Sequence, residues 1–318
     1  MAINEWAAHA AQDVMAQLGA RIATALAVRV PPSGATIRRI IRDTCPGGLA
    51  DLLGHDPAGA DTLAVDGKSA RGSRLDTTPA AHLLAAMTGT GMTVTQLRVP
   101  EKTNEITCFA ALLAPYDLHG ITVTGDAMHT QRDHARCLVE VKKAHYAFTV
   151  KRNQKNLYEQ LRTLPWGEAT AQFYDRTQGH GRKETRVVQV LTVTGLGVDF
   201  PHAAQAVRHR TDTRTGKQSR ETVYVITDLT SRQASPERIA TILRAHWVIE
   251  TRLHFVRDTA FREDASKIRT GHSPENMATL RSFAINQLRT AGHTNIAAGL
   301  RTTALRPYER PLAILGLN

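Results

Sequence analysis

Cysteine is scarce in this sequence. The 318 residues contain three cysteines, Cys45, Cys108 and Cys137, which lie far apart and form no C-x-x-C pair. An odd number of widely spaced cysteines argues against a disulfide framework and against a thiolate zinc site. We therefore expect a protein of the reducing cytoplasm.

Long apolar runs are missing as well. No stretch approaches the roughly 20 apolar residues that span a bilayer. The opening residues, MAINEWAAHA, lack the basic segment followed by an apolar run that marks a secretion signal. Apolar residues nevertheless make up 42% of the chain and charged residues 22%, which is typical of a folded globular protein. The sequence therefore predicts neither a membrane protein nor a disordered one.

Acidic residues are fewer than basic ones. The chain has 29 Asp and Glu against 40 Lys and Arg, a formal net charge of +11, and only nine of the 40 are Lys. Because the guanidinium group binds phosphate in a bidentate manner, an arginine surplus favours a polyanionic partner. A solvated basic surface encoded by an arginine-rich genome is the alternative.

The hydrophobic pattern changes its period along the chain. Residues 1–60 predict short helices, one of them around 37–42, and from residue 61 the pattern predicts a mixed sheet covered by helices. Strands are expected at 62–67, 82–89, 93–100, 121–126 and 146–151, and helices at 106–113 and 129–144. A β-rich insertion is expected at about 168–230. Helices are then expected at 235–258 and 273–289, with Ser235 and Ser273 as their N-caps.

Two aspartates end expected strands. Asp66 and Asp126 would lie where sheet-and-helix domains gather ligand sites, and two adjoining carboxylates repel each other unless a cation lies between them. Carboxylate oxygens favour Mg²⁺ or Mn²⁺. Glu250, in an apolar stretch of an expected helix, is the leading third ligand. As alternatives, Asp66 before a glycine is a turn former, and Glu250 is an ion-pair partner of His246, His254 or Arg257.

Six ordered blocks carry a resemblance to a known family. They are LAVDGKSARGS (63–73), EKTNEI (101–106), ITVTGDAMHTQ (121–131), FTVKRNQKNLYEQL (148–161), GHGRKETR (179–186) and the long block that begins HWVIETRLHFVRD at 246 and ends near 288. Together they resemble the H-repeat-associated insertion-sequence transposases of bacteria, which carry a DDE triad on a ribonuclease H-like fold. The resemblance covers most of the chain from 62 to 290.

The resemblance implies a site. Its triad would be Asp66, Asp126 and Glu250, acting as catalytic residues and as ligands of Mg²⁺ or Mn²⁺. The residues that would bind DNA are Lys68, Arg71, Lys151, Arg152, Asn153, His246, Arg252 and Arg257. Relatives carry a Tyr, Arg, Glu, Lys signature on the helix of the glutamate, whereas this chain has Leu243, His246, Glu250 and Arg257 there. For Glu263 and Asp264 a structural role is favoured over one near the metals, and Trp247 is expected in the core.

The resemblance also implies a function. We expect a metal-dependent transposase that cleaves the ends of an insertion sequence and transfers the strand into target DNA. Its partner would be double-stranded DNA, with a homodimer forming on it, in the bacterial cytoplasm at the nucleoid. We expect residues 1–60 to be a truncated helical N-terminal segment and 61–318 the catalytic domain. The alternatives are an inactive, truncated remnant that only binds DNA and a nuclease of the same fold without joining activity.

Overall fold

A computed structural model describes residues 2–23, 27–76, 78–179, 181–215 and 217–317. The chain forms two compact units, and each is made of separate stretches of sequence. The first unit comprises residues 1–54, 69–83 and 253–318, and the second comprises residues 55–68 and 84–252. Among the described residues no helix has both the length and the apolar character needed to cross a membrane.

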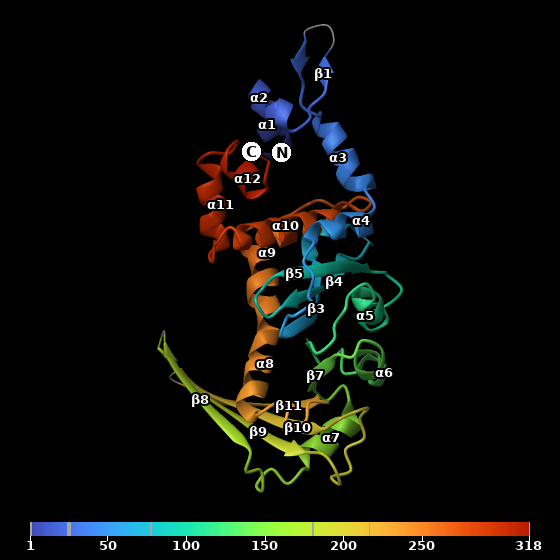
Figure 1. The fold of residues 1–318 in the computed structure, drawn as a ribbon, viewed down its shortest axis with the longest axis vertical. Helices are drawn as coiled ribbons and strands as arrows, with labels where there is room; N and C mark the ends of the chain where they lie inside the picture. Colours follow the sequence, from blue (N-terminus) through green and yellow to red (C-terminus); the bar gives the residue numbers. More distant parts are fainter. Residues whose placement is uncertain (1, 24–26, 77, 180, 216, 318) are drawn as a thin grey trace. The chain divides into compact units, whose positions relative to one another are not determined.

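A nine-stranded sheet runs in the order β5-β4-β3-β6-β7-β11-β10-β9-β8 (Figure 1). Its first five members are β3 (Thr62–Ala70), β4 (Ala81–Thr88), β5 (Thr93–Val99), β6 (Thr122–Gly125) and β7 (His145–Val150). Strands β3, β6 and β7 are parallel neighbours, whereas the short β4–β5 connection makes that pair an antiparallel hairpin. The sheet order β5-β4-β3-β6-β7 thus consists of three strands consecutive in sequence, β3 to β5, and of β6 and β7, which lie parallel to β3. This is a ribonuclease H-like sheet, so the expected fold class is confirmed.

Helices cover both faces of this sheet in the second unit. On one face lie α5 (Glu105–Leu113), α6 (Arg132–Arg136) with the π-helical turn η3 (Cys137–Val141), and α7 (Lys155–Arg162). Their apolar side chains, among them Phe109, Leu138 and Leu161, enclose a core with the buried residues of β3 to β7. On the other face α8 (Pro236–Val248) packs Ile239 and Ile242 against the sheet. The sheet is therefore the middle of three layers.

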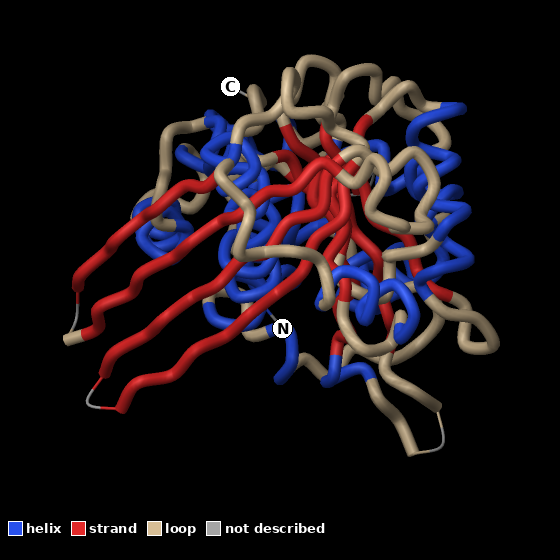
Figure 2. Tube along the Cα trace, turned by 90° about the horizontal axis from the view of Figure 1, so that it is seen from below, coloured by secondary structure: helices blue, strands red, loops and turns tan. Residues whose placement is uncertain are grey.

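The expected β-rich insertion prolongs the same sheet. It consists of β8 (Gln172–Gly179), β9 (Arg182–Thr192), β10 (Gln205–Thr215) and β11 (Lys217–Thr227), each antiparallel to its neighbour. Strand β11 also pairs antiparallel with β7. Figure 2 shows the four strands running side by side as one long ribbon. The sequence indicated strands within β9 and β11 but not β8 and β10, whose polar residues carry too weak a hydrophobic alternation.

The first unit is mainly helical. Residues near both ends of the chain form one small core, in which Ala10, Val14 and Met15 pack with Leu312. The indole of Trp6 donates a hydrogen bond to the carbonyl of Pro307 at 3.0 Å. The elements of this unit are α1 (Ala2–Ala8), α2 (Gln12–Gln17), β1 (Ile22–Ala23), β2 (Val28–Arg29), α3 (Gly34–Asp43), α4 (Pro46–Ala50), η1 (Asp51–Leu53), η2 (Arg71–Ser73), α9 (Phe255–Thr259), η5 (Glu263–Ala265), α10 (Ser273–Thr290), α11 (Ile296–Ala304) and α12 (Arg310–Ile314).

Two local expectations were wrong. Strand β3 does not end at Asp66 but continues to Ala70, so Asp66 lies inside a strand and not at a turn. Ser273 is the first residue of α10 and not its cap, because its own N–H turns back to the carbonyl of Thr270 and the side chain is buried. Ser235 does cap α8, since its hydroxyl accepts the N–H of Arg238. The expected domain boundary at residue 60 stays a prediction.

Candidate active site

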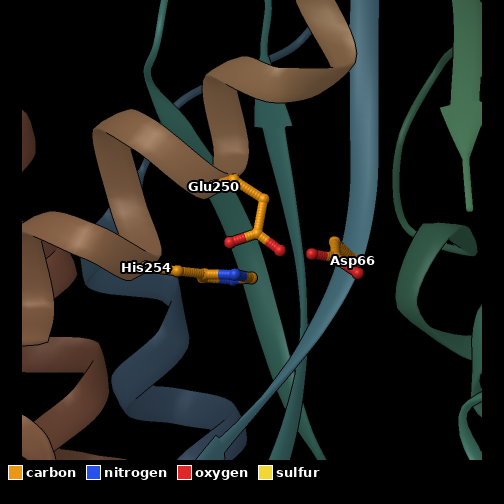
Figure 3. Close-up of side chains that lie close together, drawn as sticks. All are labelled: Asp66, Glu250 and His254. Atoms are coloured by element: carbon orange, nitrogen blue, oxygen red, sulfur yellow. The ribbon is translucent and has the colours of Figure 1, made fainter. Parts of the chain in front are cut away.

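Asp66 and Glu250 face each other. Asp66 is half-buried on β3. The exposed Glu250 lies in the first turn of a π-helical segment, η4 (Ile249–His254), that follows α8 without a break. Figure 3 shows the Glu250 carboxylate turned toward Asp66, with the ring of His254, one turn further along the helical segment, beside them. One ligand atom from each of the three residues lies within 4.8 Å of the others. Single π-turns in α-helices are frequent at functional sites.

The electrostatics of Asp66 are strongly perturbed. Burial, a hydrogen bond with Glu250 and the charge of Glu250 raise its pKa from 3.8 to about 8, and the charge of Asp126 adds to the rise. A backbone hydrogen bond from Gly67 acts in the opposite direction. Burial and the adjoining carboxylate therefore favour the protonated form of Asp66, which can donate a hydrogen bond to Glu250.

The donor set fits a divalent cation. Two carboxylates in contact repel each other when both are ionised, and a cation between them would replace the proton of Asp66. Carboxylate oxygens suit hard cations, and one imidazole nitrogen is compatible with a first-row divalent metal.

Asp126, the third expected acid, directly follows β6. Its Oδ1 accepts the backbone N–H groups of Met128 at 2.8 Å and His129 at 3.3 Å, which closes a tight turn after the strand. Its charge raises the pKa of Asp66, so the two carboxylates are neighbours. Among the described residues, however, the close group of possible ligand atoms contains His254 and not Asp126.

The turn that carries Asp126 is braced by the segment after β7. The amide of Asn153 donates to the carbonyl of Ala127 at 2.7 Å, and the amide of Gln154 donates to that of Thr130 at 2.9 Å. Asn153 was expected to contact DNA, and the structure gives its amide this internal partner. Residues 126–130 are thereby fixed to the next parallel strand.

A buried acid and histidine lie beneath β3. The carboxylate of Glu105 makes a hydrogen bond of 3.0 Å with Nε2 of the fully buried His129. A Cβ placed on Gly67 would come within 2.1 Å of the Glu105 carboxylate, so the acid packs directly on the backbone beside Asp66. Sequence reasoning missed Glu105, and it placed His129 at the start of the helix expected at 129–144. The blocks EKTNEI and GDAMHTQ contain both residues, but nothing in the sequence shows that they touch.

Two basic residues of the glutamate helix anchor it to the sheet. The ring of His246 makes a hydrogen bond of 3.1 Å with the hydroxyl of Thr124 on β6. The guanidinium of Arg252 donates to the carbonyl of Thr90, in the turn between β4 and β5, at 2.8 Å. These contacts fix the rotation of the helix about its axis, and this rotation directs Glu250 toward β3.

Arg257 is committed to an internal ion pair. Its guanidinium is fully buried and donates to both oxygens of Glu263, which is 1% exposed and also pairs with Arg281 at 3.0 Å. Asp264 accepts the backbone N–H of Arg71 at 3.1 Å. Glu263 and Asp264 thus have the structural contacts that the sequence favoured for them. Trp247, expected in the core, is 65% exposed because it points away from the sheet-facing side of α8.

The remaining expected DNA contacts are accessible to different degrees. Arg71, Lys151 and Arg152 are exposed, and Lys68, on β3 two residues after Asp66, is half-buried. The guanidinium of Arg152 lies 5.9 Å from the ring centre of Tyr158 on α7. The guanidinium of Arg71 also pairs with the carboxylate of Asp264 at 3.7 Å, whereas the exposed Lys151 and Arg152 are accessible to phosphate groups.

Comparison with known proteins identifies the family. Residues 57–287 match the family described as "Transposase DDE domain", and this region holds all three expected acids. The chain belongs to this transposase family. Its members among curated proteins include "Putative transposase YncI" of Escherichia coli O157:H7, 32% identical over 74% of this chain, and "H repeat-associated putative transposase YhhI" of Escherichia coli K12, 31% identical over 74%. The expected resemblance is thereby confirmed.

The match to these transposases is partial in length. This chain spans 63% of the E. coli O157:H7 relative and 65% of the K12 relative. Among solved structures, a piggyBac transposase synaptic complex with hairpin DNA superimposes on 93% of this chain and 66% of its own, with a TM-score of 0.46 and 12% identity.

Proposed function

We propose that this member of the transposase family cleaves DNA at the ends of an insertion sequence and transfers the freed 3′ end into target DNA. The observation that carries the proposal is the contact between Asp66 and Glu250, two acids 184 positions apart in the chain whose hydrogen-bonded carboxyl groups fit a divalent cation. Double-stranded DNA is the proposed partner, and pairing of two ends calls for two copies of the chain.

Asp66 and Glu250 would hold the cation, Mg²⁺ or Mn²⁺, and Asp126 would share in this role. A bound divalent cation activates a water or a 3′-hydroxyl and stabilises the leaving oxygen of an in-line displacement at phosphorus. Both cleavage and strand transfer are displacements of this kind, so one carboxylate site can serve both steps. To bind the cation, the carboxyl group of Asp66 must be deprotonated. Without a metal, the hydrogen bond with Glu250 and the charge of Glu250 raise the pKa of Asp66 and so favour its protonated form.

Cationic side chains would hold the phosphates. We assign this role to Lys68, Arg71, Lys151 and Arg152, because their charged groups are exposed or half-buried. Asn153, His246 and Arg252 are assigned to positioning, because each already binds a backbone or hydroxyl group next to the acids. Arg257 is left out of the DNA contacts because its guanidinium is buried.

The test compares Asp126→Asn with the wild-type chain on labelled linear DNA that carries candidate ends, in Mg²⁺, in Mn²⁺ and in EDTA. We expect the wild type to cleave with metal only, and Asp126→Asn to bind DNA without cleaving it. Asp117→Asn is the matched control, since the exposed Asp117 also accepts a backbone N–H at a turn, that of His119 at 3.0 Å.

The outcomes separate the alternatives. Full cleavage by Asp126→Asn would refute the assignment of the acids. Binding without any cleavage by the wild type would favour the inactive remnant, and cleavage without joined product would favour a nuclease. The mass of the protein–DNA complex, measured by light scattering, tests whether two copies pair the ends.

A further inference from the structure

The four-stranded ribbon β8–β11 has two very different faces. Because side chains alternate along a strand, the register assigns every residue of the ribbon to one face or the other. One face, which we call the basic face, carries six cations and a single acid, Asp212. The six cations are Arg176, Lys183, Arg208, Arg210, Arg214 and Arg220.

On the opposite face of the ribbon, basic and acidic residues are nearly equal in number, and helix α8 packs against its apolar residues. Among the residues whose side chains are described, it carries two arginines, Arg182 and Arg186, against three acids, Asp175, Glu184 and Glu221. Two of these acids, Asp175 and Glu184, are used in ion pairs within the unit, for example between Asp175 and Arg244 of α8 at 2.8 Å. The apolar residues of this face pack against α8. The positive charge of the ribbon is therefore concentrated on one side.

The basic face is accessible and keeps much of its charge. Arg176, Lys183 and Arg214 are exposed, and none of them forms an ion pair with another described residue. Arg210 and Arg220 share Asp212, at 3.3 and 2.6 Å. Like charges held side by side without counter-ions destabilise a sheet. An external polyanion would relieve this repulsion.

The dimensions of the face suit a nucleic acid duplex. From Arg208 to Arg214 the strand covers roughly 20 Å, and four strands are about 15 Å wide, at the usual rise and spacing. Duplex DNA presents one charge for about every 1.7 Å of its axis, so such a face meets on the order of ten phosphates. At the inner end of the face Arg208 lies over the ring of Trp166, 5.2 Å from its centre, which fixes its guanidinium in place.

We propose that the basic face of the ribbon is a second duplex-binding surface, which grips the DNA backbone through phosphates, separate from the cations near the acids. The proposal rests on the proposed function, because it takes duplex DNA as the partner. It predicts that the surface contributes affinity and salt dependence but no sequence specificity, since phosphate contacts carry no base information.

The test measures binding of the full-length chain to a 40-base-pair duplex by fluorescence anisotropy, in EDTA and at several salt concentrations. The triple variant Arg176→Gln, Lys183→Gln, Arg214→Gln should bind about 10- to 100-fold more weakly near 0.15 M salt. The slope of log affinity against log salt should fall by about 0.9 for each lost contact, between 2 and 3 in all.

A neighbouring pair of residues provides the matched control. Gln218 and Ser219 are both exposed and adjacent on β11, but they lie on opposite faces. Gln218→Glu, on the basic face, should weaken binding several-fold, whereas Ser219→Glu should leave it within about twofold. Circular dichroism spectra that match the wild type show that both variants fold, and this pair remains informative even if the triple variant does not fold.

Each outcome decides one question. Two results would overturn the proposal that the basic face binds DNA and leave the proposed function intact. One is an equal loss of DNA affinity in Gln218→Glu and Ser219→Glu. The other is a salt slope of the triple variant that equals that of the wild type. If the triple variant loses binding to single-stranded RNA but not to duplex DNA, the proposal that the basic face binds duplex DNA is overturned in favour of another partner. If the wild type binds no duplex, the DNA partner of the proposed function fails together with this surface.

Discussion

The carboxylate of Glu263 gives a sharp test of what stabilises the first unit. Glu263 is 1% exposed and accepts three hydrogen bonds from the fully buried Arg257, at 2.7, 2.9 and 3.1 Å. It accepts a fourth from Arg281 at 3.0 Å. The substitution Glu263→Gln keeps the size of the side chain and removes the charge. Two largely buried guanidinium groups would then face a neutral amide.

The expected cost follows from burial. Removal of one partner from a buried ion pair costs about 3–5 kcal/mol, because the other charge is left in a poorly hydrated site. Total stabilities of domains are about 5–15 kcal/mol, so the change is a large fraction of the whole. The exposed pair of Glu309 with Arg306, 69% and 62% exposed, is the matched control. Glu309→Gln should cost less than about 1 kcal/mol.

The measurement is urea denaturation followed by circular dichroism, with hydrogen exchange of α10 peptides to localise the effect. Arg281 and its neighbours on α10 should lose protection in Glu263→Gln and keep it in Glu309→Gln. If Glu263→Gln lowers the free energy of unfolding by less than about 1 kcal/mol, the cluster is not a main source of stability, and the reasoning from burial is refuted.

Three further predictions concern the acids and the glycine beside Asp66. Gly67→Ala should lower the free energy of unfolding by about 1–3 kcal/mol, because the new Cβ would lie 2.1 Å from the Glu105 carboxylate. The control is Gly167→Ala, where a Cβ would have no atom within 4 Å. In the same urea titration its free energy of unfolding should differ from that of the wild type by less than about 0.5 kcal/mol. Metal affinity should rise with pH up to about 8, which is the raised pKa of Asp66. Close to one proton should be released for each ion bound at neutral pH, and calorimetry in buffers of different ionisation enthalpy measures this number. A metal affinity that does not change with pH would contradict the prediction. Since the folded, metal-free protein holds this proton more tightly than the unfolded chain, its free energy of unfolding should fall as pH rises from about 4 to 8, and Asp66→Asn should remove that fall.

The sequence predicted the sheet well because its strands are short, apolar and separated by clear turns. The run at 121–126 and the helix at 106–113 match β6 and α5 to within a residue or two. The end of β3 was misplaced because an Asp-Gly pair usually marks a turn. In the structure Gly67 serves a different purpose, which is to admit Glu105 against the strand. A glycine chosen for close approach cannot be told from one chosen for a turn without the partner residue.

The site was predicted only in part, for a related reason. Two of the expected acids, Asp66 and Glu250, meet, and the charge of Asp126 acts on Asp66. His254 was considered only as an ion-pair partner of Glu250. Its place beside both acids depends on the π-turn at 249–254, which changes the direction of every later side chain on the helix. The sequence of this turn does not differ visibly from that of an ordinary α-helix.

The basic face shows how register turns composition into a surface. A net charge of +11 indicates a polyanionic partner but does not place it. Within β10 the pattern Arg208, Arg210, Asp212, Arg214 already has the period of two that one strand face requires. A single strand with such a pattern is only a stripe. It becomes a face because Lys183 lies opposite Arg214, and Arg220 opposite Asp212, on neighbouring strands. A shift of one residue in either pairing would turn the charges of the shifted strand to the opposite face, so the proposed DNA surface depends on register as directly as the hydrophobic core does.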